Sequence, residues 1–155
     1  MKEFLRHALA TLAYRGGKVL RDAPPGFAEF RAADKIRTPL QIVAHLGDLI
    51  EWSCTMARGE KTWNESQPKS WDEEVAHFFD ALRRLDDILA SDAPLGCDGA
   101  RLFQGPIADA LTHVGQLGML RRLAAAPVRS ENFFIADIAV GRVGKEQSPP
   151  KREFE

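Results

Sequence analysis

Two capping boxes mark where two helices of this chain begin, and they constrain its fold more than any other feature. Residues 38–41 read Thr-Pro-Leu-Gln, and residues 70–73 read Ser-Trp-Asp-Glu. In each, a hydroxyl side chain precedes a glutamine or glutamate by three positions, which satisfies backbone N–H groups at a helix start. Apolar residues then recur at helical spacing. We therefore expect helices that run to about residues 58 and 90.

Two further segments predict a helix before and after this pair. Residues 2–22 carry apolar side chains at helical spacing. Near the other end, Gly105-Pro106 predicts a helix start, because proline at the first helical position loses only an N–H that has no partner there. Pro127 predicts that this helix ends at or just before Ala126. Residues 91–104 are then expected to form a loop.

Four amphipathic segments with few strand signals predict an all-α protein, a four-helix bundle. The connection over residues 59–69 is long enough for a crossover between the second and third helices. The apolar segment 132–140 is expected to lie across the bundle as an extended cover or to contact a partner. We expect one domain, with the bundle over residues 1–140 and a frayed, polar C-terminal tail over residues 141–155.

Charge and hydropathy argue against two classes of partner. The formal net charge is -1, from 21 basic and 22 acidic residues, whereas nucleic acid binding needs a concentrated basic face. No window approaches the roughly 18 apolar residues of a membrane span, and the N-terminus lacks the features of a signal peptide. The two cysteines show no disulfide pattern. A reduced, cytoplasmic setting is therefore expected.

One helix carries a pair of side chains suited to a metal ion. Asp109 and His113 are four residues apart, which places them on one helix face with Cβ atoms about 5–6 Å apart. A carboxylate and an imidazole at this spacing can hold one ion, and His45 on the second helix is the best candidate for a third ligand. Three protein ligands leave a position open for water or substrate, which is typical of catalytic sites.

Each candidate also has a simpler interpretation. A histidine on an apolar helix face is more often a hydrogen-bonded core residue, as His113 or His45 could be, and an acidic residue in a first turn complements the helix dipole. Asp48 could accept the second N–H of the His45 ring and fix its tautomer, or it could be a solvated charge. Gln116 could orient a ligand or only pack between helices. Trp52 is expected to be core or pocket wall.

Two motifs surround the candidate ligands. Residues 38–52 place His45, followed by leucine, seven positions before Trp52, and residues 113–117 read His-Val-Gly-Gln-Leu. This pair resembles the DinB/YfiT-like superfamily, which has a histidine ahead of a tryptophan on helix 2 and a His-x-x-x-His-x-Gly-Gln-Leu pattern on its last helix. The resemblance extends over about residues 2–126.

The resemblance implies a metal site formed by His45, Asp109 and His113. The chain departs from the common pattern at Asp109, where the family usually has a histidine. A carboxylate still binds zinc, nickel, iron or manganese, so the change alters the ligand set without removing it. The resulting two histidines and one carboxylate also match the composition of iron(II) oxygenase sites.

The family implies an up-down-down-up bundle with a short C-terminal extension, often a homodimer. It also implies a metal-dependent enzyme, either a thiol-dependent transferase or a hydrolase, that acts on a small-molecule substrate. The expected cofactors are a divalent transition metal (Zn, Ni, Fe or Mn) and a low-molecular-weight thiol. Two alternatives stay open, a non-catalytic metal-binding or stress-associated interaction protein and an iron(II) oxygenase.

Overall fold

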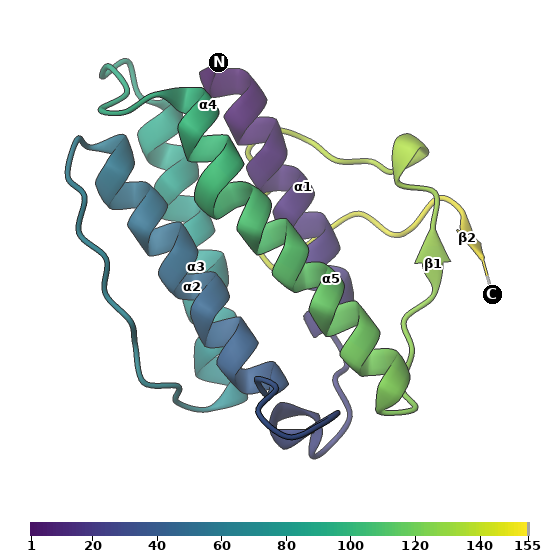
Figure 1. The fold of residues 1–155 in the computed structure, drawn as a ribbon. Helices are drawn as coiled ribbons and strands as arrows, with labels where there is room; N and C mark the ends of the chain where they lie inside the picture. The colour runs from purple at the N-terminus through teal and green to yellow at the C-terminus, as the bar shows by residue number, and fades with distance from the viewer. Residues whose placement is uncertain (155) are drawn as a thin grey trace.

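The computed structural model describes residues 1–154, in which long helices pack side by side (Figure 1). The long helices are α1 (Lys2–Leu20), α2 (Pro39–Ala57), α3 (Trp71–Ala90) and α5 (Ala108–Leu123). The short elements are η1 (Phe27–Glu29), α4 (Gly99–Leu102), η2 (Phe103–Ile107), β1 (Ser130–Glu131), η3 (Phe133–Ile135) and β2 (Glu153–Phe154). The predicted all-α class is confirmed, since the two strands are only two residues each.

Both predicted capping boxes are formed. The Thr38 hydroxyl accepts the backbone N–H of Gln41 at 3.3 Å, and the Gln41 side chain accepts the Thr38 N–H at 2.9 Å. Ser70 and Glu73 make the equivalent pair of bonds at the start of α3, at 3.4 and 3.1 Å. Each box satisfies donors that the first helical turn would otherwise leave unpaired. The starts of α2 and α3 are therefore as predicted.

The four helices point in two directions. Arg121, near the end of α5, donates to two backbone carbonyls at the end of α1, so α1 and α5 are parallel. Arg6, near the start of α1, pairs with Asp86, near the end of α3, and the N–H of Gly96 after α3 binds the carbonyl of Ala57 at the end of α2. Helices α2 and α3 therefore run together, opposite to α1 and α5. Their connection runs back along the bundle (Figure 1), which is the crossover that its length permits.

One apolar core lies between the helices. Residues whose side chains are completely enclosed come from all four, and burial of each contributes about 1.5–3 kcal/mol. Gly16 lets α3 approach α1, because a Cβ there would lie 3.1 Å from the ring of Phe78. The largest fully buried side chains are Phe78, Leu5, Leu9, Leu12, Ile42, Leu46, Ile50, Leu82, Leu85, Leu89, Leu102 and Ile107.

The predicted start of the last helix is wrong. Helical structure begins at Gly99, where the Asp98 carboxylate accepts the N–H of Arg101 at 3.0 Å, so the loop is six residues shorter than predicted. Gly105 and Pro106 lie inside η2, a π-helical segment in which Gly105 has a non-helical φ of -83° and ψ of -106°. Proline has no N–H to give to the preceding turn, and the wider π turn accommodates that loss. The pair makes a bend in the helix, not its start.

The last helix also ends earlier than predicted. Its final residue is Leu123, and Ala125 adopts a left-handed conformation with φ of 57°. A left-handed residue just past the last turn is a common way to end a helix, because it turns the chain back toward the unpaired carbonyls. Pro127 therefore follows the end of α5 by several residues and does not itself set it.

The expectation of a frayed tail is wrong for residues 141–154, which return to the bundle. Strands β1 and β2 pair in antiparallel register. The Lys18 ammonium on α1 binds Glu131 at 2.8 Å and Glu153 at 2.6 Å, and the Tyr14 hydroxyl donates to Glu131 at 2.6 Å. These contacts join residues 131 and 153 to α1, and Figure 1 shows β1 and β2 side by side.

The apolar segment 132–140 lies partly as expected. Phe133 packs edge-on against Tyr14 of α1, with ring centroids 6.3 Å apart, so this part does cover the bundle. Phe134 beside it is 96% exposed and makes no such contact. Within residues 1–154, no helix is both long and apolar enough to cross a membrane.

Candidate metal centre

His45 on α2 and the pair Asp109 and His113 on α5 meet between the two helices. One ligand atom from each side chain lies within 4.8 Å of the other two. The His45 Nε2 is 3.9 Å from one carboxylate oxygen of Asp109, and the His113 Nδ1 is 3.3 Å from the other. Ligands that share one ion through bonds of about 2.0–2.2 Å lie about 3–4 Å apart. The 3.9 Å between His45 and Asp109 therefore fits a common ion, whereas the 3.3 Å contact shows only that the ring of His113 lies beside the same carboxylate.

The bend before α5 determines where Asp109 lies. The carboxylate follows Pro106 by three residues and sits in the first turn of α5, next to the π-helical segment. Segments of this type are common at functional sites. The helix dipole also favours a carboxylate at this position. The placement of Asp109 is therefore compatible both with a metal ligand and with a residue that only complements the dipole.

A backbone hydrogen bond orients the imidazole of His113. Its Nδ1 lies 2.9 Å from the carbonyl oxygen of Asp109. A carbonyl oxygen can only accept, so Nδ1 carries the proton and Nε2 keeps its lone pair. This arrangement is the usual one for metal-binding histidines, whose second nitrogen donates to a carbonyl or carboxylate. It also means that His113 is a hydrogen-bonded, buried histidine, as the simpler interpretation holds.

The surroundings of His45 favour its neutral form. Burial lowers the pKa of the His45 imidazole, and the positive charge of Arg37 and the neighbouring His113 lower it further, while Asp109 and Asp48 act in the opposite direction. A neutral imidazole at physiological pH has a free lone pair, which is the form that binds a metal ion. The rings of His45 and His113 lie close, with centroids 4.8 Å apart.

Two tryptophan rings form a wall beside His45. Trp63, in the connection between α2 and α3, packs edge-on against the His45 ring with centroids 5.9 Å apart. Trp52 packs against Trp63 at 5.6 Å, so the expected pocket-wall residue reaches the site through a second aromatic. Sequence reasoning did not select Trp63 for the site. The signal that could have found it is a large aromatic side chain in an otherwise polar connection.

Asp48 and Gln116 both lie near the metal centre, but they make different contacts. The Asp48 carboxylate accepts the backbone N–H of Ser66 at 3.0 Å, so it anchors the connection that carries Trp63, and the expected hydrogen bond to His45 is not among those that the described residues make. Gln116 is exposed and lines a cavity together with His113. Its position is compatible with contact to a ligand.

Two cavities open on the centre from different sides. The first, of about 200 Å³, is polar and is lined by His45 and Asp48 with residues 65–68. The second, of about 410 Å³, is lined by His113 and mainly by apolar side chains. Arg37 lines both. The apolar wall consists of Ala32, Ile36, Ile42, Met119, Leu120 and Leu123.

The donor set suits a divalent transition ion. Two neutral imidazoles and one carboxylate match the preferences of zinc, nickel, iron and manganese. The side chains of His45 and His113 are 16% and 10% exposed, while that of Asp109 is 46% exposed. The two histidines are thus held by the bundle, and the open side next to Asp109 gives access to a ligand from solution.

No family model, curated protein or solved structure matches this chain. The likeness to the DinB/YfiT-like superfamily therefore depends on the motifs at residues 38–52 and 113–117 and on the way their side chains meet. It remains a proposal.

Proposed function

We propose that this protein is a metal-dependent enzyme of the DinB-like type that acts on a small molecule at His45, Asp109 and His113. The observation that carries the proposal is the convergence of these three side chains from two helices that are far apart in the sequence. The parallel pairs formed by α1 with α5 and by α2 with α3 support the DinB-like assignment, since that family has an up-down-down-up order.

The residues around the centre have separable roles in this proposal. A divalent ion held by the three ligands would supply Lewis-acid chemistry and lower the pKa of a thiol or water that it binds. The Asp109 carbonyl keeps the Nε2 of His113 free, and Trp63, packed on Trp52, covers one side of the His45 ring. The apolar cavity beside His113 would bind the body of the substrate, with Arg37 placed to meet an anionic group.

A thiol for a transferase reaction would have to come from outside the chain. Burial raises the pKa of the Cys54 thiol to about 11, so it stays protonated and unreactive at neutral pH. Burial and the nearby Asp98 also raise the pKa of Cys97. A low-molecular-weight thiol is therefore the cosubstrate we propose for a transferase, with water in its place for a hydrolase. The homodimer and the cytoplasmic setting stay part of the proposal on the resemblance alone.

The metal content of the purified protein tests the centre. We expect close to one equivalent of a divalent transition metal in the native chain and its loss in His45→Ala and in His113→Ala. His7→Ala is the matched control, because His7 is exposed on α1, away from the other three residues. Full occupancy that survives both ligand substitutions would contradict the proposed site.

Turnover separates the enzyme from its alternatives. The metal-loaded protein is incubated with electrophiles such as 1-chloro-2,4-dinitrobenzene, with and without glutathione or cysteine, and with simple amides and esters. Thiol-dependent product formation supports the transferase and thiol-independent hydrolysis supports the hydrolase. Stoichiometric metal without turnover in any of these reactions favours the non-catalytic alternative, and oxygen consumption that requires added iron favours the oxygenase.

A further inference from the structure

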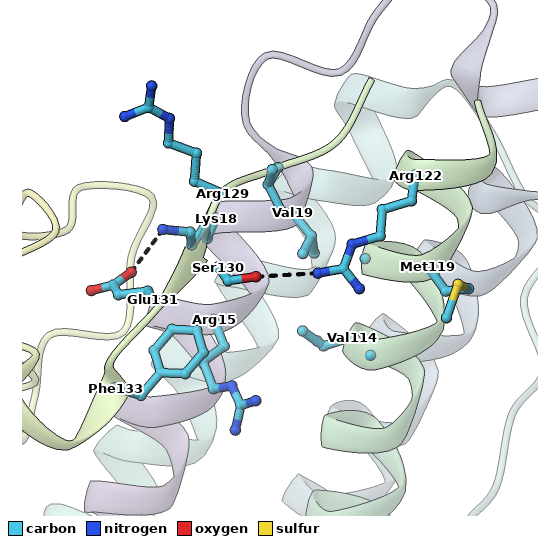
Figure 2. A pocket seen from close by; sticks show the side chains of 13 residues that line it. Arg15, Lys18, Val19, Val114, Met119, Arg122, Arg129, Ser130, Glu131 and Phe133 are labelled. Carbon is cyan, nitrogen blue, oxygen red and sulfur yellow. Dashed lines mark hydrogen bonds and ion pairs between the residues drawn. The ribbon is translucent and has the colours of Figure 1, made fainter. Parts of the chain in front are cut away.

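A separate cavity of about 280 Å³ lies between α1, α5 and the segment that follows α5 (Figure 2). On α5 it is lined by residues such as Gly115, Gly118 and Arg122, which lie on a different face of the helix from His113. Its floor is open because neither glycine carries a side chain, and a Cβ at Gly115 would meet nothing within 4 Å. The cavity contains none of the three metal-ligand candidates, although Met119 lines both this cavity and the apolar one beside His113.

Cationic side chains surround this cavity. Arg15 and Lys18 come from α1, Arg122 from α5 and Arg129 from the segment before β1 (Figure 2). Because the formal net charge of the chain is -1, this concentration does not reflect an overall excess of basic residues. Like charges that gather around one hollow repel each other, and an anion between them would relieve that repulsion.

The charge of Lys18 is already satisfied within the protein. Its ammonium binds Glu131 and Glu153 at 2.8 and 2.6 Å, and the Glu131 side chain is completely buried. Arg129 lies near enough to Glu153 to help lower the pKa of that carboxyl, after the larger effect of the Lys18 hydrogen bond. Carboxylates of the protein therefore already lie near the charges of Lys18 and Arg129, and we look to the other two cations for a ligand contact.

Arg15 and Arg122 have no carboxylate partner among the described residues. Arg15 lies over the ring of Phe133, with its guanidinium carbon 4.5 Å from the ring centroid, and Arg122 donates only to the hydroxyl of Ser130 at 3.3 Å. Other arginines do pair with carboxylates, as Arg6 does with Asp86 at 2.8 Å. Two guanidinium groups are thus free to donate to an oxyanion.

The remaining wall is apolar. Val19, Val114, Val128 and Phe133 line the same space, so a ligand that fills it would bury carbon atoms as well as an anionic group. The volume lies just below the usual range for ligand pockets, about 300–1,000 Å³. It suits a small molecule and is too small to enclose a peptide or an oligonucleotide.

We propose that this cavity binds a small organic anion. The oxyanion group, a phosphate monoester or a carboxylate, lies between Arg15 and Arg122, and the apolar body of the ligand contacts Phe133 and Val114. Guanidinium groups recognise both oxyanions through paired, charge-assisted hydrogen bonds. The site stands whether or not a metal ion is bound at His45, Asp109 and His113.

The test is an NMR titration of the full-length, ¹⁵N-labelled protein as purified. Phenyl phosphate and phenylacetate are the two organic probes, and inorganic phosphate and benzyl alcohol separate the contributions of charge and ring. We expect saturable shifts of the Gly115 and Gly118 amide signals with at least one organic probe, and weaker binding of both inorganic phosphate and benzyl alcohol. The stronger organic probe identifies the oxyanion.

Two variants and two controls decide whether the two arginines are responsible. Arg15→Gln and Arg122→Gln should each weaken binding about tenfold, which is typical for loss of one charge-assisted hydrogen bond. Arg101→Gln removes the same charge from an exposed position on α4 and should leave the affinity unchanged. His45→Ala should also leave it unchanged, since it alters only the metal centre.

Four results would overturn the proposal. They are the absence of saturable shifts at Gly115 and Gly118, equal affinity for inorganic phosphate and the organic probes, equal weakening by Arg101→Gln, and loss of binding in His45→Ala. The last would show that the probe binds at the metal centre instead. Because the substituted arginines are exposed, the variants are expected to fold, which circular dichroism verifies.

Discussion

Two polar clusters in this protein contrast in how completely their hydrogen-bonding capacity is used. In the ion cluster formed by Tyr14, Lys18, Glu131 and Glu153, every charged group has an opposite charge at 2.6–2.8 Å. In the metal centre, two imidazoles and a half-exposed carboxylate face one another, and the closest contact between the Asp109 carboxylate and either ring is 3.3 Å.

The difference separates a structural cluster from a candidate site. Pairing inside the protein stabilises one arrangement of the chain, which explains how the ion cluster fastens the C-terminal segment to α1. Groups that lie close without pairing keep lone pairs available, which is what a metal ion needs. We therefore expect substitutions in the ion cluster to change stability and substitutions in the metal centre to change metal binding.

The largest expected effect is on stability, in the ion cluster. Glu131→Gln keeps the size of the side chain but removes the charge that faces buried Lys18, and loss of one partner of a buried ion pair costs about 3 kcal/mol. Denaturant unfolding measures the change, and metal content should not fall. Glu146→Gln, at an exposed position, is the control. A loss no larger than that of the control would contradict the assigned role.

The metal centre should show the opposite response. Asp109→Ala removes a ligand and should weaken metal binding by at least about a hundredfold, since loss of even an outer contact to a ligand costs about 10–100-fold. The side chain is half exposed, so the free energy of unfolding of the metal-free protein should change by no more than about 0.5 kcal/mol. Competition with a chromophoric chelator measures the affinity. A large loss of stability with unchanged metal affinity would show that Asp109 stabilises the fold and is not a metal ligand.

Asp48 lies beside the metal centre but bonds to the backbone of the connection, so its substitution distinguishes an effect on stability from an effect on metal binding. Because its carboxylate anchors the connection at Ser66, Asp48→Ala should cost about 1–2 kcal/mol of stability and change the tryptophan fluorescence through Trp63. Metal affinity should change only a few-fold. A loss of about 10–100-fold in affinity would instead support the sequence-based hypothesis that Asp48 orients His45.

The smallest expected effect is the pH dependence contributed by Glu153. The hydrogen bond from Lys18 is the main cause that lowers the pKa of the Glu153 carboxyl from its ordinary value of 4.5. A lowered folded-state pKa means that the stabilisation is present above pH 4.5 and is lost as the pH falls through the lower value. Urea unfolding between pH 6 and 3 should therefore show a shallower acid loss in Glu153→Gln than in the wild type. Parallel curves would contradict this contribution.

Features set by neighbouring residues could be predicted from the sequence. The capping boxes require only residues three positions apart, so the starts of α2 and α3 were correct. The metal pair Asp109 and His113 likewise follows from a spacing of four. The start of the last helix was wrong because Gly105-Pro106 is compatible with either a helix start or a bend, and the earlier cap at Asp98 decides between them.

Apart from the meeting of His45 with Asp109 and His113, which the sequence led us to expect, features that join distant parts of the chain could not be predicted. The return of residues 141–154 depends on contacts between Lys18 and two glutamates more than a hundred residues away, and local composition there resembles that of a mobile tail. The position of Trp63 beside His45 also arises from packing of the connection against α2. Sequence spacing carries no record of such contacts.

The most direct test of the metal centre is an anomalous difference map from crystals of the native protein, recorded on both sides of the absorption edge of the metal that elemental analysis identifies. The account predicts one strong peak about 2.0–2.2 Å from a nitrogen of His45, a nitrogen of His113 and an oxygen of Asp109. A peak at other residues, or a metal-loaded crystal with no density between these three side chains, would contradict it.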